Sequence, residues 1–129
     1  MKNKFALLLL SFFFPTVSLT SCNLSNQNYT CITPEEAKKI MDKESNIIIL
    51  DVHEKEEYDA GHIKGAMCLP LGEVEEKAHL YLNDKSQKIL VYCRSGRRSK
   101  EACNILVKLG YTNIYEFGGI LDWPYETTK

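Results

Sequence analysis

The sequence predicts an α/β domain whose sheet is mainly parallel and covered by helices on both faces. Continuous apolar runs at residues 47–50 and 88–92 are typical of strands that are buried on both sides. Amphipathic segments with helical spacing lie between these runs, and such alternation favours a parallel sheet. The 129 residues, 44% hydrophobic and 26% charged, are enough for one globular domain.

The first half of this domain begins with a helix that has a clear start signal. Thr33 can cap the helix, Pro34 suits its first position, and Glu36 completes a capping box. The elements expected next are a strand at 47–50, a short acidic helix at 54–58 and a short strand at 66–69.

The second half repeats the alternation of helix and strand. Apolar residues recur at helical spacing in two groups: Leu71, Val74, Ala78 and Leu82, then Ala102, Ile105, Leu106 and Leu109. Gly110 stands where a helix commonly ends. Strands are expected at 88–92 and at 114–117. Ligands bind beyond the carboxyl ends of the strands in such sheets, which directs attention to the loop after residue 92.

The N-terminal segment has the pattern of an export signal. Two lysines precede an apolar run at residues 5–14, which is too short to span a membrane. The sequence Leu-Thr-Ser-Cys at 19–22 resembles the bacterial lipobox, which implies that a lipid is attached to Cys22 before cleavage. We therefore expect a signal peptide at 1–21, a polar tether at 22–30 and the domain at 31–129.

This pattern predicts an exported protein that is lipid-anchored in the cell envelope, on the periplasmic or outer face of a membrane. Secretion as a soluble or periplasmic protein, a retained anchor and a buried N-terminal helix are the alternatives. Acidic and basic residues nearly cancel, 17 against 16, so that no basic face indicates nucleic acid as a partner.

The loop at residues 93–99, Cys-Arg-Ser-Gly-Arg-Arg-Ser, carries the strongest chemical signal. Cys93 would face the unpaired N–H groups and the positive end of the helix that follows it. Three arginines add positive potential, and both effects favour the thiolate. Ser95 and Gly96 allow the backbone to curl into an anion-binding nest. The alternative is a cysteine that is simply buried at the end of a strand.

Several short motifs occur in a characteristic order around this loop. They are Asp51-Val52, Glu57-Tyr58, Gly61-His62-Ile63, Gly65-Ala66, Leu69-Pro70, the loop at 93–99, Gly118-Gly119 and Trp123. In this order and spacing the chain resembles a single-domain rhodanese. The resemblance implies the rhodanese-like fold, with a mainly parallel five-stranded sheet, and sulfurtransferase activity without a cofactor. The three histidines have no metal-ligand spacing, so no metal site is expected.

The resemblance also implies a two-step reaction at Cys93. The thiolate takes the outer sulfur of thiosulfate or a similar anionic donor, and cyanide or a thiol then removes that sulfur from the persulfide. The N–H groups of the loop would stabilise the anionic intermediate. Arg94 and Arg97 are expected to attract the donor, whereas Arg98 could either attract it or brace the loop. The expected substrate-binding residues are Arg94, Ser95, Gly96, Arg97, Arg98 and Ser99.

Two other classes of function compete with this interpretation. A rhodanese-like binding module without catalysis is one, although such modules commonly lack the cysteine that Cys93 supplies. A cysteine-based phosphatase or redox enzyme is the other. Its anion cradle needs an arginine at position 99, where this sequence has Ser99. A monomer is the default expectation for so small a domain.

The remaining histidines and cysteines receive secondary roles. His53 replaces the arginine that is usual after Asp-Val, and we expect an exposed loop histidine rather than a titrating group. His62 is expected to hold its loop by hydrogen bonds, and His79 to lie on the surface. Cys68 is a candidate resolving partner for Cys93.

Two further cysteines complete the set. Cys103 is expected to pack in the core, and Cys31 precedes the first helix. A disulfide among the cysteines other than Cys22 is plausible outside a reducing cytosol.

Overall fold

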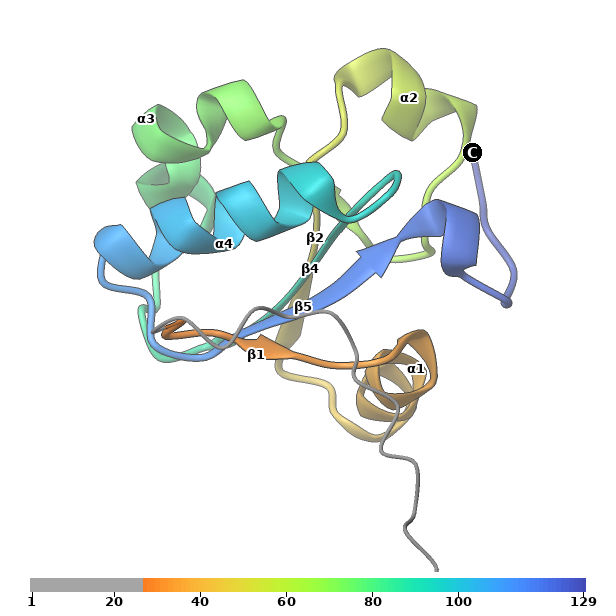
Figure 1. Cartoon of the computed structure of the whole chain (residues 1–129), viewed down its shortest axis with the longest axis horizontal. Coiled ribbons are helices and arrows are strands. Elements are labelled where there is room, and N and C mark those ends of the chain that lie inside the picture. The colour runs from red at the N-terminus through yellow and green to blue at the C-terminus, as the bar shows by residue number, and fades with distance from the viewer. Residues whose placement is uncertain (1–26) are drawn as a thin grey trace, which may run out of the picture.

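The computed structural model describes residues 27–129, so the expected signal peptide and Cys22 lie outside the described residues (Figure 1). The elements are β1 (Thr30–Cys31), α1 (Pro34–Lys43), β2 (Ile47–Asp51), α2 (Lys55–Ala60), β3 (Met67–Cys68), α3 (Leu71–Tyr81), β4 (Lys88–Cys93), α4 (Arg97–Lys108), β5 (Ile114–Gly119) and the 3-10 turn η1 (Ile120–Asp122).

The sheet has five strands in the order β1-β5-β4-β2-β3, and every pair in it is parallel. The predicted fold class, an α/β domain with a parallel five-stranded sheet, is therefore confirmed. β4 lies in the middle of the sheet, between β5 and β2. Its carboxyl end is thus flanked by the ends of two neighbouring strands, where the loop expected to carry the chemistry begins.

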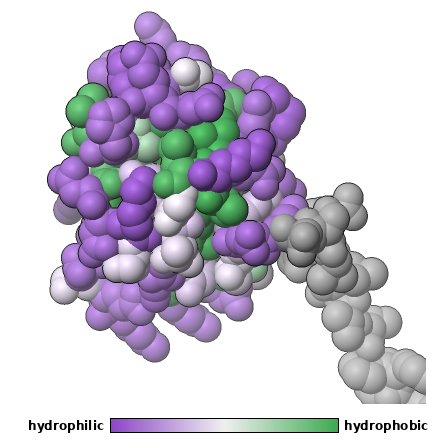
Figure 2. Space-filling view, turned by 90° about the vertical axis from the view of Figure 1, so that its left-hand side faces the viewer, coloured by the Kyte–Doolittle hydropathy of each residue, from purple (hydrophilic) through white to green (hydrophobic). Residues whose placement is uncertain are grey.

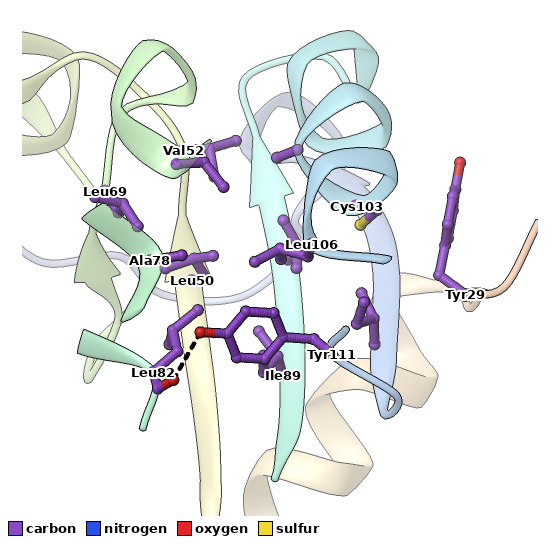
Figure 3. Packing of buried hydrophobic residues seen from close by; sticks show 14 of the residues in the cluster. Tyr29, Leu50, Val52, Leu69, Ala78, Leu82, Ile89, Cys103, Leu106 and Tyr111 are labelled. Carbon is purple, nitrogen blue, oxygen red and sulfur yellow. Dashed lines mark hydrogen bonds between the residues drawn. The ribbon is translucent and has the colours of Figure 1, made fainter. Parts of the chain in front are cut away.

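Helices cover both faces of this sheet. α3 and α4 pack on one face, where Leu50 and Ile89 of neighbouring strands face Leu106 of α4 (Figure 3). On this side the Tyr111 hydroxyl donates a hydrogen bond of 2.7 Å to the Leu82 carbonyl. The opposite face packs against α1 and the C-terminal segment, through a second cluster that includes Trp123. Two cores therefore hold β4 in place from both sides.

The start of α1 and the end of α4 have the features that the sequence predicts. Glu36 N donates to Thr33 Oγ1 at 3.1 Å, and Thr33 N donates to Glu36 Oε2 at 2.8 Å, which is the expected capping box. Gly110 follows α4 with a φ of 93°, a left-handed conformation that favours glycine. α4 itself begins at Arg97, and the short loop after Cys93 leads directly into its polar first turn.

The expected tether is too long by two residues. Tyr29 is buried in the core on the α4 face, and Thr30 pairs with Tyr115 as the start of β1. The polar Thr30 interrupts the apolar residues around β1, whereas the equally short β3 lies within the continuous apolar segment 66–69. The ordered domain therefore begins before residue 31.

The side of the molecule formed by α3 and the end of α4 shows apolar side chains between polar ones (Figure 2). On α3, Leu80 and Tyr81 are 60% and 47% exposed. Within residues 27–129, no helix combines the length and the apolar character that crossing a membrane requires.

Candidate active site

The loop that follows β4 curls around the sulfur of Cys93. Cys93 is the last residue of β4, and α4 begins at Arg97, so only three residues connect strand and helix. Gly96 has a φ of 99°, a left-handed conformation that glycine adopts without strain. A side chain at Gly96 would also approach the backbone of Gly118. The tight turn therefore depends on glycine at this position.

The sulfur of Cys93 lies among hydrogen-bonding groups of this loop. Gly96 N donates to Cys93 Sγ at 3.0 Å, and Ser99 Oγ lies 3.5 Å from the same sulfur. An N–H donor and a helix N-terminus both favour negative charge on sulfur. Cys93 is 0% exposed, whereas Arg94 and Ser95, which follow it in the loop, are exposed.

Behind this sulfur lies a buried acid that the sequence analysis did not single out. Ser99 Oγ donates to Glu116 Oε1 at 2.5 Å, and Gly118 N donates to the same oxygen at 2.9 Å. Glu116 is only 3% exposed. It fixes the hydroxyl of Ser99 beside the sulfur. The signal in the sequence was an acid inside an otherwise apolar strand, two residues before the first of two glycines.

Those two glycines let β5 pass directly beneath the loop. A Cβ on Gly119 would lie 2.0 Å from the Arg94 carbonyl oxygen, closer than real Cβ contacts come. Leu121 N also donates to that oxygen at 3.1 Å. The segment after β5 therefore supports the loop by close backbone contact.

The three arginines of the loop have three different environments. Arg98 binds Glu57 of α2 with two hydrogen bonds of 2.6 and 2.9 Å, and this contact lowers the pKa of Glu57 to about 2. Arg98 therefore braces the loop against α2, and its guanidinium is not free to bind an anionic sulfur donor. Arg97 is 76% exposed and lies 3.8 Å from Glu101 along α4. Of the three, Arg94 lines a pocket.

That pocket has a volume of about 340 Å³ and lies beside the loop. Its lining residues are His53, Glu57, Ala60, Gly61, Arg94 and Ile120. The expectation that His53 is exposed is wrong, because its side chain is only 2% exposed. Asp51 explains this: its Oδ1 accepts a hydrogen bond from His53 N at 2.9 Å and lies 2.7 Å from His53 Nδ1.

The other two histidines lie where they were expected. His62 stacks on Tyr58 with ring centroids 3.7 Å apart, and its Nδ1 lies 2.8 Å from the Tyr58 carbonyl. Its backbone also pairs with Thr128. His79 is exposed on α3. The structural role of His62 is therefore confirmed.

The proposed link between Cys68 and Cys93 is wrong. Cys68 is on β3 and Cys93 on β4, and β2 lies between them. Two strand spacings separate the Cα atoms by about 9.5 Å, which exceeds the reach of a disulfide. Both thiols are free, and burial raises the pKa of Cys68 to about 11. Cys103 is free and fully buried in the core, as expected.

This fold and this cysteine loop define a rhodanese-like domain. Residues 33–125 match the family described as the Rhodanese-like domain, and the chain belongs to this family. Among relatives, it is similar to "Thiosulfate sulfurtransferase PspE" of Escherichia coli, with 40% identity over 73 residues that cover 57% of this chain and 70% of that protein. "Putative sulfur carrier protein YrkF" of Bacillus subtilis is 39% identical over 97 residues, 74% of this chain.

The chain spans 51% of the length of YrkF, so about half of that relative has no counterpart in the matched region. Solved structures agree on the fold. A "rhodanese with anions from E. coli" superposes with a TM-score of 0.61 at 36% identity, covering 64% of this chain and 98% of that one. The Alr3790 protein from Anabaena superposes with a TM-score of 0.70 at 29% identity, covering 75% and 90%.

Proposed function

We propose that this protein is a sulfurtransferase that carries a sulfane sulfur as a persulfide on Cys93. The observation that carries the proposal is the hydrogen bond of 3.0 Å from Gly96 N to Cys93 Sγ, at the N-terminus of α4. The thiolate is the nucleophilic form of cysteine, and this environment favours it. The relative PspE, named a thiosulfate sulfurtransferase, supports the same chemistry.

In the first step the Cys93 thiolate attacks the outer sulfur of thiosulfate. A sulfur–sulfur bond forms to Cys93, the bond within thiosulfate breaks, and sulfite leaves with the electron pair of that bond. The product is an anionic persulfide, which the N–H of Gly96 and the positive end of α4 stabilise. No proton needs to be removed once the thiolate has formed, so the step requires no general base.

In the second step an acceptor takes the outer sulfur. Cyanide attacks the terminal sulfur of the persulfide, thiocyanate leaves, and the electron pair of the broken bond returns to Cys93 as thiolate. A thiol acceptor reacts in the same manner and becomes a persulfide itself. Ser99, held by Glu116, lies beside Cys93 Sγ during both steps and orients the sulfur.

The experiment is transfer of sulfur from thiosulfate to cyanide, measured as thiocyanate, by the wild-type and Cys93→Ser proteins. Mass spectrometry of the thiosulfate-treated protein should show one added sulfur on the peptide that contains Cys93. A Cys68→Ser protein is the matched control, because that free thiol lies on β3 and β2 separates it from Cys93. Wild-type protein that transfers no sulfur from any donor refutes the proposal, and hydrolysis of a phosphate ester supports the phosphatase class instead.

We also propose that the protein is exported and anchored to a membrane by a lipid on Cys22. The support is the apolar run at residues 5–14 followed by the lipobox-like residues 19–22. Metabolic labelling with an alkyne fatty acid tests this. The wild-type chain should take up label and the Cys22→Ala chain should not, whereas label on both chains refutes the proposal.

A further inference from the structure

We propose that a second pocket, on the face of the sheet that α1 covers, binds an uncharged planar aromatic molecule. This pocket has a volume of about 610 Å³, and residues of α1, of β2 and of the C-terminal segment 123–126 line it. Proteins bind small molecules in pockets of about 300–1,000 Å³. It shares no lining residue with the pocket beside the Cys93 loop, so the inference does not depend on the proposed sulfur transfer.

The inner surface of this pocket is largely apolar. Met41 of α1, Ile49 of β2 and Ile63 line it, and all three take part in the apolar cluster on this face of the sheet. Met41 and Ile49 are only half-buried, so part of their apolar surface stays exposed at the pocket. A ligand that covers this surface removes it from water, which is favourable.

Two aromatic rings form the wall that the C-terminal segment supplies. Trp123 and Tyr125 both line the pocket, with ring centroids 5.0 Å apart and an angle of 69° between the ring planes. A third ring placed beside this pair can stack on one ring and meet the other edge-on, and both arrangements are favourable. A planar aromatic ligand therefore suits this wall better than a branched aliphatic one.

The segment that carries these two rings is held at both ends. Trp123 is 8% exposed and packs against Phe117 of β5, with ring centroids 5.6 Å apart. Further along the chain, Thr128 and His62 exchange two backbone hydrogen bonds of 2.8 and 2.9 Å. The wall is therefore in place before a ligand arrives, which lowers the entropic cost of binding.

The charged groups of the pocket balance one another. Lys38 and Lys64 line it together with Asp42 and Glu126, two positive and two negative side chains. Lys38 is paired with Asp42 along α1, and its Nζ lies 5.6 Å from the centroid of the Tyr125 ring. A charged ligand of either sign gains no net attraction from such a set, and it would lose hydration among the apolar side chains. An uncharged ligand avoids that cost.

The test follows the fluorescence of Trp123, which is the only tryptophan of the chain. N-phenylnaphthylamine, an uncharged aromatic probe, should quench the emission of Trp123 and become fluorescent itself. Anilinonaphthalene sulfonate has the same rings with a negative charge added, and it should bind more weakly by about fivefold or more.

Tyr125→Ser removes one ring of the wall and should weaken binding of the uncharged probe by about fivefold or more. Tyr81→Ser is the matched control, because Tyr81 is also exposed but lies on α3, outside the pocket. Met41→Glu adds a charge on the α1 side of the pocket and should weaken binding as well.

Three results overturn the inference. They are unchanged emission of Trp123 in the presence of the uncharged probe, equal or tighter binding of the sulfonate, and equal affinity of the Tyr125→Ser and Tyr81→Ser proteins for the uncharged probe. Thermal melting establishes that each variant is folded, so that a loss of affinity is a loss at the pocket. Met41→Glu is the second variant if Tyr125→Ser unfolds, and unchanged affinity in that protein also contradicts the inference.

Discussion

Gly119→Ala should strongly reduce sulfur transfer at the loop around Cys93, although the substitution adds only one methyl group. The new Cβ would lie 2.0 Å from Arg94 O and 2.5 Å from Ser95 N, although real Cβ contacts stay beyond 3.0 Å. The loop backbone must therefore move by about 1 Å, and a displacement of that size costs about 100-fold in rate. Gly119 has a φ of −139°, an extended conformation open to any residue, so the penalty is purely steric.

The same clash also lowers stability. Overpacking of this kind costs about 1–3 kcal/mol, and each kcal/mol lowers the melting temperature of a domain of this size by about 4–8 °C. Thermal melting and thiocyanate production measure the two effects. Gly72→Ala in α3 is the matched control, because nothing lies within 4 Å of its Cβ. Gly119→Ala protein with the melting temperature and transfer rate of wild type would refute the reasoning.

Three further predictions concern the ion pair between Glu57 and Arg98, the helix cap at Thr33 and the thiol of Cys68. Pairing with Arg98 lowers the pKa of Glu57 from its ordinary 4.5 to about 2. The pair therefore stabilises the fold fully above about pH 4.5, and this stabilisation is lost as the pH falls toward 2. Since Glu57 is 36% exposed, Glu57→Gln should lower the free energy of unfolding by only about 1 kcal/mol at neutral pH. In urea unfolding, this difference between wild type and variant should shrink as the pH falls; a difference that stays constant contradicts the prediction. Thr33→Ala should lower the free energy of unfolding, measured from the urea midpoint, by about 1 kcal/mol. Thr33→Ser keeps a hydroxyl that can cap the helix and should lose much less stability; an equal loss in both variants would argue against the cap. Cys68→Ser should leave thiocyanate production unchanged because β2 separates it from Cys93, and a lower rate would count against this geometry.

The elements of the fold were predictable because their signals are local. Four of the five strands, the capping box at Thr33 and the glycine after α4 each arise from residues adjacent in the chain. Cys93 could be placed at a strand end by the same reasoning, since the strand pattern stops there and a glycine follows. β1 was missed because the polar Thr30 interrupts any apolar run there, and its pairing depends on β5, which lies more than 80 residues away along the chain.

The partners within the site were not predictable in the same way. The sequence left open whether Arg98 binds donor or braces the loop, and its contact with Glu57 spans 41 residues. His53 looked exposed because it follows a strand in a polar segment, yet the neighbouring Asp51 and Tyr92 enclose it. Cys68 was a candidate resolving partner for Cys93, and the strand order excludes this by placing β2 between them.

By itself, the sequence determined the α/β class, the strand that carries Cys93 and the loop that surrounds it, because apolar spacing and glycine positions act over a few residues. The tertiary structure alone decided which charges are neutralised, which histidine is buried and which side chain fixes Ser99. Those outcomes depend on strand order and on packing between distant segments, so that Arg98 is paired and Glu116 lies behind the sulfur.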